Sequence, residues 1–383
     1  MTEKIRLGDI ATTITKGTTP TTIGFPFVDT GINFVKIESI DEAGNFLPDR
    51  FAHITDECNR KLGRSKLEEN DILFSIAGAI GRTAIVTKSI LPANTNQALA
   101  IIRIPSNAIN LQFVLYALQS QAVAEQSAKQ KQGVAQLNLS LKNIADIQIP
   151  LVSSEKQAEI VRILAALDVT IGQRKEQIKF IDQLVKSRFI ELFAGVEAED
   201  TLQNLCTFID YRGKTPEKVE SGLPFITAKN IRMHHMSFDT LEYISKETYD
   251  RVMTRGFPQI GDVVFTTEAP LGNVCRIPFI ETEFYIGQRI ITMQTERLEP
   301  AYLEYALSSD EFKRKIAEKS SGSTVTGIRS KLLEQLTIPV PPRAQQQQFA
   351  AFVEQTDKSK LAVQKGLQEL EILKKSLMQQ YFG

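Results

Sequence analysis

Hydrophobic residues recur in alternating steps of three and four along two long stretches of the chain, residues 154–194 and 342–382. This heptad spacing is typical of a helix that packs lengthwise against another helix. In the first stretch the repeating positions are Ile160, Leu164, Leu167, Ile171, Ile178, Ile181, Val185 and Leu192. In the second stretch they are Phe349, Val353, Val363, Leu367, Leu370, Leu377 and Tyr381. The pattern predicts two amphipathic helices, each about 60 Å long at 1.5 Å per residue.

The second stretch repeats the first at a constant distance, since Phe349 follows Ile160 by 189 positions. The segments before the two stretches also repeat, because Asp262-Val263-Val264-Phe265 matches Asp71-Ile72-Leu73-Phe74 at a distance of 191 positions. A repeat of this length indicates two domains rather than a solenoid, whose period is about 20–50 residues. We therefore predict four consecutive parts, a globular domain, a helix, a second globular domain and a second helix, at residues 1–153, 154–195, 196–341 and 342–383.

Short β-rich runs and helical runs alternate within the first globular part. Strands are predicted at residues 32–37, 71–76, 83–86, 98–104 and 147–150. Helices are predicted at residues 7–11 and 111–126. The glycine-containing segment 78–81 lies between two predicted strands, so we interpret it as a hairpin turn rather than a phosphate loop. The fold class is a mixed α+β fold that consists of a tandem duplication of one domain plus one long helix.

Pairing of the two helices within one molecule is favoured over pairing with a second molecule. A parallel pair would set Lys360 beside Ile171 and would bury the charge without a partner. An antiparallel register in which paired residue numbers sum to 541, as for Leu164 and Leu377, stacks apolar side chains instead. The predicted seam of this intramolecular antiparallel coiled coil contains Leu164, Ile171, Ile178, Val185, Leu192, Val353, Val363, Leu367, Leu370 and Leu377.

The same antiparallel register also brings opposite charges together along the edge of the helix pair. Polar residues at core positions of a coiled coil fix its register and orientation at some loss of stability. The predicted charge pairs are Asp168 with Lys374, Asp182 with Lys360, and Glu354 with Arg188.

Composition excludes several classes of protein. Lys plus Arg and Asp plus Glu both number 45, so no global field draws the chain toward nucleic acid or membrane. No apolar run approaches the ~20 residues of a membrane span, and the N-terminus lacks a signal-peptide core. Cys58, Cys206 and Cys275 lie far apart, which favours buried reduced thiols. We expect a cytoplasmic protein without a membrane partner.

Motifs of common catalytic sites are missing from the sequence. It contains no GxxxxGK[ST] phosphate loop, no GxGxxG segment after a strand, no HExxH and no Gly-x-Ser-x-Gly. The pair His234-His235 lacks Cys or Glu at ligand spacing, so we interpret it as part of a surface loop rather than a metal site. We predict no catalytic residue and no metal ligand in this chain.

Polar and basic loops recur at equivalent places in the two globular parts. Each loop alone is typical of a solvated surface, but Arg, Lys, Asn and Gln also recognise base edges, and Ser and Thr bind phosphates. The DNA-binding candidates of the first part are Lys16, Thr18, Thr19, Lys36, Arg82, Asn94, Asn96, Gln97, Lys131 and Gln132. Those of the second part are Arg212, Lys214, Thr215, Lys229, Asn230, Arg232, Gln288, Arg289, Ser321, Ser323 and Thr324.

A set of motifs in both repeats resembles one known family. In the first repeat these are residues 71–74, 78–81, 96–97, 132–133, 137, 141, 147–151, 155–157, 160–161 and 164. In the second they are residues 262–265, 272, 288, 322, 338–342 and 345–346. Together they resemble the DNA-specificity subunit of a type I restriction–modification system. Two segments depart from the pattern. The first repeat has Val152-Ser153 where the second repeat has the more typical Pro341-Pro342, and residues 269–271 alter the turn that matches residues 78–80.

The resemblance implies a non-catalytic subunit in which each globular domain recognises one half of a split, asymmetric site in double-stranded DNA. It implies that the coiled coil sets the length of the spacer and that two methyltransferase subunits dock on the helices. Restriction subunits would then join through this complex. The partners would bind S-adenosylmethionine, ATP and Mg²⁺ for adenine N6 methylation and ATP-dependent cleavage, and this chain would bind no cofactor.

Three alternatives stay open at this point. The first is the recognition subunit of a related system with fused restriction and methylation subunits. The second is a coiled-coil adaptor that binds proteins. The third is a self-sufficient enzyme, which the missing motifs disfavour.

Overall fold

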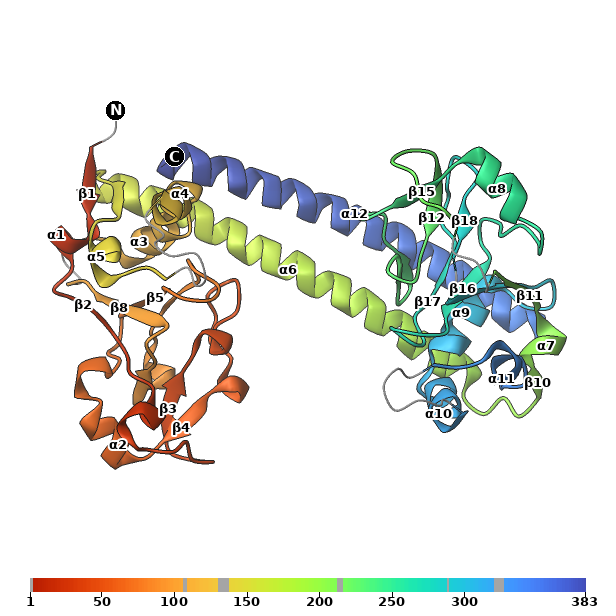
Figure 1. The fold of residues 1–383 in the computed structure, drawn as a ribbon, viewed down its shortest axis with the longest axis horizontal. Coiled ribbons are helices and arrows are strands. Elements are labelled where there is room, and N and C mark those ends of the chain that lie inside the picture. The colour runs from red at the N-terminus through yellow and green to blue at the C-terminus, as the bar shows by residue number, and fades with distance from the viewer. Residues whose placement is uncertain (1–2, 106–108, 130–137, 212–215, 288, 320–326) are drawn as a thin grey trace. The chain divides into compact units, whose positions relative to one another are not determined.

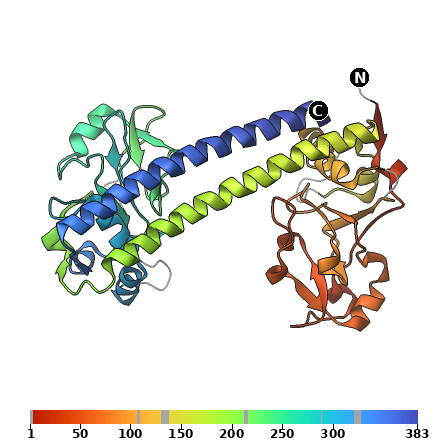
Figure 2. The ribbon, with the colours of Figure 1, turned by 180° about the vertical axis from the view of Figure 1, so that it is seen from behind.

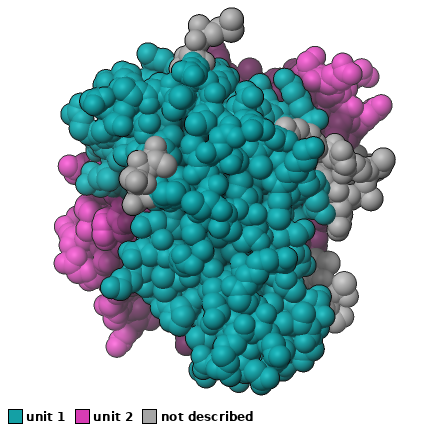
Figure 3. Space-filling model, turned by 90° about the vertical axis from the view of Figure 1, so that its left-hand side faces the viewer, with its two compact units in different colours: residues 1–175, 365–383 teal, residues 176–364 magenta. Residues whose placement is uncertain are grey.

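A computed structural model of the 383-residue chain describes all residues except 1–2, 106–108, 130–137, 212–215, 288 and 320–326. The chain divides into two compact units (Figure 3). Unit 1 comprises Met1–Lys175 and Lys365–Gly383, and unit 2 comprises Glu176–Gln364. Each unit contains one globular domain and parts of both long helices, so the two are described separately.

Unit 1 contains two main sheets (Figure 1). The antiparallel four-stranded sheet has the order β2 (Thr13–Lys16), β8 (Leu99–Arg103), β5 (Ile72–Ser75) and β6 (Thr83–Ile85). The three-stranded sheet has the order β4 (Ala52–Ile54), β3 (Ile32–Val35) and β7 (Ala93–Thr95), with β3 and β7 parallel. A separate antiparallel pair joins β1 (Lys4–Arg6) to β9 (Gln148–Pro150). The predicted hairpin turn at residues 78–81 is confirmed, because it connects β5 to β6.

Unit 1 also contains several short helices. They are α1 (Leu7–Ile10), α2 (Asp56–Lys61), α3 (Leu111–Leu118), α4 (Gln121–Lys129) and α5 (Leu141–Ala145). The prediction of one helix over residues 111–126 is wrong. The helix ends at Leu118, and the Ser120 hydroxyl accepts a hydrogen bond from the Val123 amide at 3.3 Å. A serine that accepts such a bond begins a new helix, so two short helices form.

Unit 2 repeats the same topology. Its four-stranded sheet has the order β11 (Thr207–Asp210), β19 (Ile290–Gln294), β16 (Val263–Thr266) and β17 (Val274–Arg276). Its three-stranded sheet has the order β15 (Glu242–Ile244), β12 (Leu223–Ile226) and β18 (Tyr285–Ile286). The separate pair is β10 (Glu199–Thr201) with β20 (Thr337–Pro339). The identical strand order confirms the tandem duplication.

Unit 2 also contains a strand pair that has no equivalent among the named strands of unit 1. This is the small antiparallel hairpin of β13 (Ile231–Arg232) and β14 (His235–Met236). The helices of the unit are α7 (Leu202–Leu205), α8 (Lys246–Val252), α9 (Pro300–Ser308), α10 (Asp310–Lys319) and α11 (Ser330–Glu334).

Two long helices, α6 (Ser154–Phe193) and α12 (Arg343–Phe382), have 40 residues each. They lie side by side in both ribbon views (Figures 1 and 2). Within the described ranges, no helix has the length and apolar character needed to cross a membrane. Of the predicted seam, the buried residues are Leu164, Ile171, Val185 and Val353. The half-buried ones are Ile178, Leu192, Val363, Leu367, Leu370 and Leu377.

Two ion pairs, one in each unit, join α6 to α12 as the antiparallel register requires. In unit 1 the Lys374 ammonium binds the Asp168 carboxylate. In unit 2 the Lys360 Nζ lies 2.6 Å from Asp182 Oδ1. Both pairs were predicted from the same register, and both are confirmed.

The third predicted pair, Glu354 with Arg188, is wrong. Arg188 binds Glu191 at 2.7 Å, and Glu354 binds Lys358 at 2.7 Å. Both observed partners lie three or four positions away on the same helix. Such neighbours already face each other on a helix surface, so they meet without a contact across the pair.

One helix of each domain connects its four-stranded sheet to the long helices. In unit 1 this helix is α3, and the core around it includes Phe74, Ile102, Phe113, Leu164 and Phe382. In unit 2 it is α9, and the core includes Phe193, Phe265, Tyr302 and Phe349. Each fully buried side chain of this size contributes roughly 1.5–3 kcal/mol. The sheets are therefore fixed to α6 and α12 by continuous apolar packing inside each unit.

Candidate nucleic-acid interface

The predicted DNA-binding loops of the first domain meet at one end of its four-stranded sheet. Lys16 ends β2, Gln97 precedes β8, and the turn 77–81 joins β5 to β6 at that same end. The Thr19 hydroxyl hydrogen-bonds to the Gln97 side chain. Gly17 approaches the neighbouring loop so closely that a Cβ there would lie 1.9 Å from the Thr95 carbonyl oxygen. The two loops therefore form one continuous polar surface.

Exposure distinguishes the candidates on this surface. Lys16 and Gln97 are exposed, whereas Thr18, Thr19 and Asn96 are half-buried. The Asn96 side-chain oxygen is engaged locally, because it accepts a hydrogen bond from the Ala98 amide at 3.0 Å. The exposed ammonium and amide groups are of the types that bind phosphates and base edges. The candidates Lys131 and Gln132 lie outside the described residues.

The second domain places the equivalent loops at the equivalent sheet end. There, Asp210 ends β11, Arg289 precedes β19, and the turn 267–273 joins β16 to β17. Arg289 is 60% exposed, and its Nε lies 3.2 Å from Glu268 Oε2. Its φ of 67° places a long side chain in a backbone region that it rarely adopts. The candidates outside the described residues are Arg212, Lys214, Thr215, Gln288, Ser321, Ser323 and Thr324.

Two asparagines that were predicted as DNA contacts are internal instead. Asn94 is 0% exposed and its Nδ2 donates to the Leu62 carbonyl at 3.2 Å. Asn230 is 1% exposed and its Nδ2 donates to the Ser237 carbonyl at 3.0 Å. Buried loop carbonyls need hydrogen-bond donors, and an asparagine amide supplies them. The prediction that these two side chains contact DNA is therefore wrong.

Lys36 and Arg82 are also turned toward the domain rather than outward. The Arg82 guanidinium donates to the Ile40 carbonyl at 2.9 Å. The Lys36 ammonium lies 4.5 Å from the centre of the Phe27 ring and 3.9 Å from Glu38. Both cations are half-buried and have intramolecular contacts, and their contact with DNA stays a prediction.

The contact made by Arg82 recurs in the second domain. Asn273, 191 positions after Arg82, donates from Nδ2 to the Ile231 carbonyl at 2.8 Å, and Ile231 lies 191 positions after Ile40. Ile40 bridges to residue 46, and Ile231 pairs with Met236. Segment 40–46 and the β13–β14 hairpin are therefore structural counterparts. Of the candidates near this hairpin, Lys229 and Arg232 are exposed.

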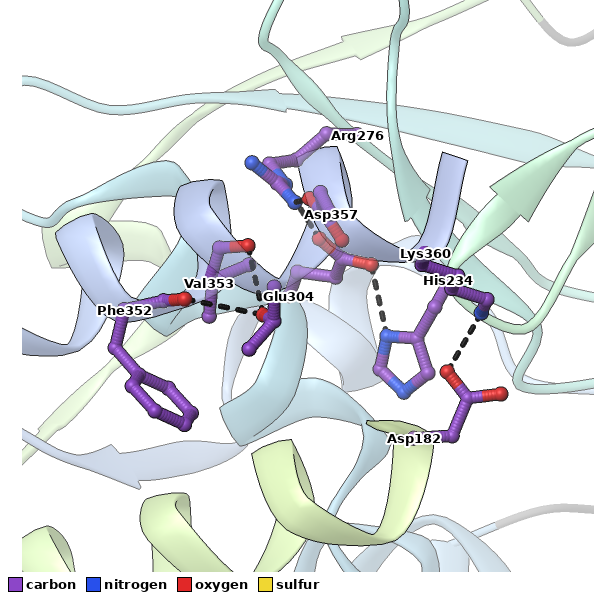
Figure 4. Close-up of polar contacts among 9 residues, drawn as sticks. Asp182, His234, Arg276, Glu304, Phe352, Val353, Asp357 and Lys360 are labelled. Atoms are coloured by element: carbon purple, nitrogen blue, oxygen red, sulfur yellow. Dashed lines mark hydrogen bonds and ion pairs between the residues drawn. The ribbon is translucent and has the colours of Figure 1, made fainter. Parts of the chain in front are cut away.

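His234 is part of a buried charge network (Figure 4), which corrects its interpretation as a surface-loop residue. Its side chain is 16% exposed, and Nδ1 lies 2.8 Å from Glu304 Oε1. Glu304 is 2% exposed and also accepts from Arg276 Nε at 2.6 Å. Arg276 in turn binds Asp357 of α12 at 2.8 Å. The sequence gives no local sign of this network, because Glu304 lies 70 positions after His234.

The surroundings of Glu304 keep its carboxylate charged. Burial raises the pKa of this group, but the hydrogen bond from His234 and the positive charge of Arg276 outweigh burial, so the pKa is lowered. Within the described part of the chain, no three His, Cys, Asp or Glu side chains are grouped as metal ligands would be.

The family model of the type I restriction modification DNA specificity domain matches residues 2–181 and 201–372. The chain belongs to this family. Each match covers one globular domain and most of the long helix that follows it, so the chain carries two specificity domains in tandem. Its DNA-specificity role follows from this membership, and specificity subunits of the family are non-catalytic.

Curated relatives and solved structures agree with this assignment. A putative type I restriction enzyme MjaX specificity subunit from Methanocaldococcus jannaschii is 24% identical over 385 residues, which cover 91% of this chain and 85% of the relative. The S subunit of a type I restriction-modification system from M. genitalium shares the fold with a TM-score of 0.56 at 15% identity, covering 100% and 96% of the two chains. A chain from a structure of type I R-M complex assembly and conformational transition has a TM-score of 0.60 at 19% identity, covering 99% and 97%.

Proposed function

We propose that this chain recognises a split, asymmetric sequence in double-stranded DNA, with one half-site bound by each specificity domain. The observation that carries the proposal is the recurrence of an exposed polar loop cluster at the same sheet end of two duplicated domains. In the first domain this cluster presents Lys16 and Gln97, and in the second it presents Arg289. Side chains of these types supply base and phosphate contacts.

The two half-sites should differ, because the loops differ at equivalent positions. Arg289 stands where the first domain has Ala98, and Glu268 stands where it has Ala77, both 191 positions earlier. Arginine donates two hydrogen bonds to guanine, and a glutamate carboxylate accepts from cytosine. Alanine can do neither, so the two surfaces present different donor and acceptor patterns.

The helix pair, in this proposal, fixes the length of the non-specific spacer. Two 40-residue helices in a fixed antiparallel register have a defined length of about 60 Å at 1.5 Å per residue. One turn of DNA is about 34 Å, so half-sites a turn or more apart are compatible with this length. The ion pairs Lys374–Asp168 and Lys360–Asp182 support a single register.

The exposed faces of the long helices are the proposed docking surface for two methyltransferase subunits. Leu184 of α6 is 53% exposed, and Leu373 of α12, 189 positions later, is 46% exposed. Large apolar side chains that are exposed at equivalent positions are typical of a protein interface. Their occurrence once in each unit supports two docked subunits rather than one.

The methyltransferase subunits would bind S-adenosylmethionine and methylate adenine at N6. Restriction subunits would join the complex through them and cleave DNA with ATP and Mg²⁺. This chain would bind no cofactor, and the complex would act in the cytoplasm. The residues described above position DNA and partner subunits only.

An electrophoretic shift assay tests DNA recognition. A duplex of random sequence should bind to the chain, alone or with its methyltransferase, and the affinity should fall as salt rises. Lack of salt-sensitive binding in both cases would contradict DNA recognition and would favour a protein-binding adaptor.

Substitution of the apolar positions tests the docking surface. The variant Leu184→Glu/Leu373→Glu should bind random duplex as the unchanged chain does but should fail to copurify with the methyltransferase. Gln355→Glu, at an exposed position of α12, is the matched control and should copurify. Normal assembly of the double glutamate variant would place the interface elsewhere.

A further inference from the structure

The two specificity domains carry opposite charges at one equivalent place. Glu38 and Asp41 of the first domain correspond to Lys229 and Arg232 of the second, each pair being 191 positions apart. The correspondence rests on one hydrogen bond that both domains share. Arg82 donates to the Ile40 carbonyl and Asn273 donates to the Ile231 carbonyl, and in each domain this carbonyl lies between the two charged residues. Duplication has thus kept the backbone contact while the charges were reversed.

The β13–β14 hairpin and the turn before it hold these basic residues beside the sheet end that carries the DNA-binding candidates. The His234 amide donates to the Val274 carbonyl at 2.8 Å, and Asn273 holds the Ile231 carbonyl at 2.8 Å. Val274 is the first residue of β17 and follows the turn at that sheet end directly. Lys229 and Arg232 are both exposed there.

The hairpin turn contains a residue with unusual backbone geometry. His234 has a φ of 59°, in the left-handed region that favours glycine, and the counterpart segment of the first domain has Gly44 with a φ of 87°. A side chain retained at such a position needs surrounding contacts that hold it. The His234 ring stacks on Tyr305 at 4.2 Å and binds Glu304 at 2.8 Å.

The contacts of His234 extend to the long helix α12. Glu304 of α9 binds Arg276 of β17, and Arg276 binds Asp357 of α12 (Figure 4). The position that corresponds to Asp357 in the first domain, Asp168, binds the Tyr116 hydroxyl and Lys374 instead. The polar chain from the hairpin turn to the helix is therefore a feature of the second domain.

We propose that the β13–β14 hairpin binds DNA phosphates in the second domain only, through Lys229 and Arg232, and that His234 is the positioning residue that holds it. The inference rests on the proposed recognition of DNA. Glu38 and Asp41, the acidic counterparts in the first domain, would repel a phosphate at this place.

The test compares the salt dependence of duplex binding for the complex of the full chain with its methyltransferase. Arg232→Gln should make the negative slope of log K against log[salt] less steep by about 0.9, the value for one lost phosphate contact. Arg251→Gln, which removes the same charge from the exposed face of α8, is the matched control and should leave the slope unchanged. If the unchanged complex does not bind duplex, the proposed function fails. If it binds and Arg232→Gln keeps the same slope, the hairpin contact is refuted.

The positioning role of His234 has its own readout. In His234→Gly, glycine accepts the left-handed backbone but removes the contacts to Glu304 and Tyr305. The slope should become less steep by about 1.8, the value for the loss of both the Lys229 and the Arg232 contact, and adding Arg232→Gln to His234→Gly should change it no further. His234→Asn, which also tolerates this backbone, replaces the glycine variant if the latter melts early. A slope equal to that of the unchanged complex in the folded variant would refute the positioning role.

Discussion

Gln157 and Gln346, which lie 189 positions apart, make the same two hydrogen bonds near the start of their respective long helices. Gln157 Oε1 accepts from the Asn110 amide at 3.0 Å, and Nε2 donates to the Val152 carbonyl at 2.9 Å. Gln346 likewise accepts from residue 299 at 2.9 Å and donates to residue 341 at 2.8 Å. Both side chains are buried. Gln157 therefore joins the start of α6 to the start of α3, and Gln346 joins the start of α12 to the start of α9.

Replacement of Gln157 by Leu should destabilise unit 1. The change leaves the Asn110 amide and the Val152 carbonyl without their partner in a buried place, and each such loss costs about 1–3 kcal/mol. Equilibrium urea unfolding measures the effect. Gln173→Leu, at an exposed position of the same helix, is the control and should change stability little. Equal stability of the two variants would contradict a joining role for Gln157.

Exchange of the charges of Asp182 and Lys360 should restore most of the free energy of unfolding that either single substitution removes. Both groups are partly exposed, so a double-mutant cycle should give a coupling energy of about 0.5–1 kcal/mol. The measurement is urea unfolding of Asp182→Lys, Lys360→Asp and the double variant. A coupling energy of zero would mean that the two residues do not pair in solution.

The stability of unit 2 should depend on pH through Glu304. Its pKa in the folded chain is lowered below the ordinary value of 4.5. The charged carboxylate therefore contributes stability that is present above the ordinary pKa and is lost as pH falls through the lowered value. Glu304→Gln should cost about 3–5 kcal/mol at pH 7, because it breaks a buried ion pair.

Thermal melting between pH 7 and pH 3 checks this dependence. The difference between the unchanged chain and Glu304→Gln should be large at pH 7 and should shrink below about pH 4.5, because the unfolded chain then binds a proton that the folded carboxylate resists. A difference that stays constant over this range would show that Glu304 is not charged in the folded chain.

Removal of one heptad from both helices should shorten the spacer. Deletion of residues 172–178 together with 363–369 keeps the antiparallel register and removes about 10 Å at 1.5 Å per residue. At about 3.4 Å per base pair, the spacer should lose roughly three base pairs. The sequences of both half-sites should stay unchanged. Deletion from one helix alone is the control, and it should abolish recognition because the register no longer matches.

The long helices and their register could be predicted because the signal is periodic and spans forty residues. A heptad pattern fixes which face of each helix is apolar. The charges of Asp168 and Lys374 and of Asp182 and Lys360 then select the antiparallel register, and the structure has both contacts. The core strands could be predicted for a similar reason, since each is a short β-rich run between turn residues.

The roles of single polar side chains could not be predicted in the same way. Asn94 and Asn230 are of a type that recognises adenine, but the same amide also satisfies buried carbonyls, and only burial separates the two uses. The contact between His234 and Glu304 joins residues from different elements, so no local pattern encodes it. The sequence did contain one usable signal. Arg82 and Asn273 both follow the matched glycines of the two repeats, and both donate a hydrogen bond to a loop carbonyl.

Methylome sequencing of cells that carry the intact system tests recognition of a split DNA site most directly. We expect methylated adenines in a motif with two different half-sites, separated by a spacer of fixed length and free sequence. The motif should disappear when the gene for this chain is deleted. A continuous motif, two identical half-sites, or methylation that persists after the deletion would contradict the account.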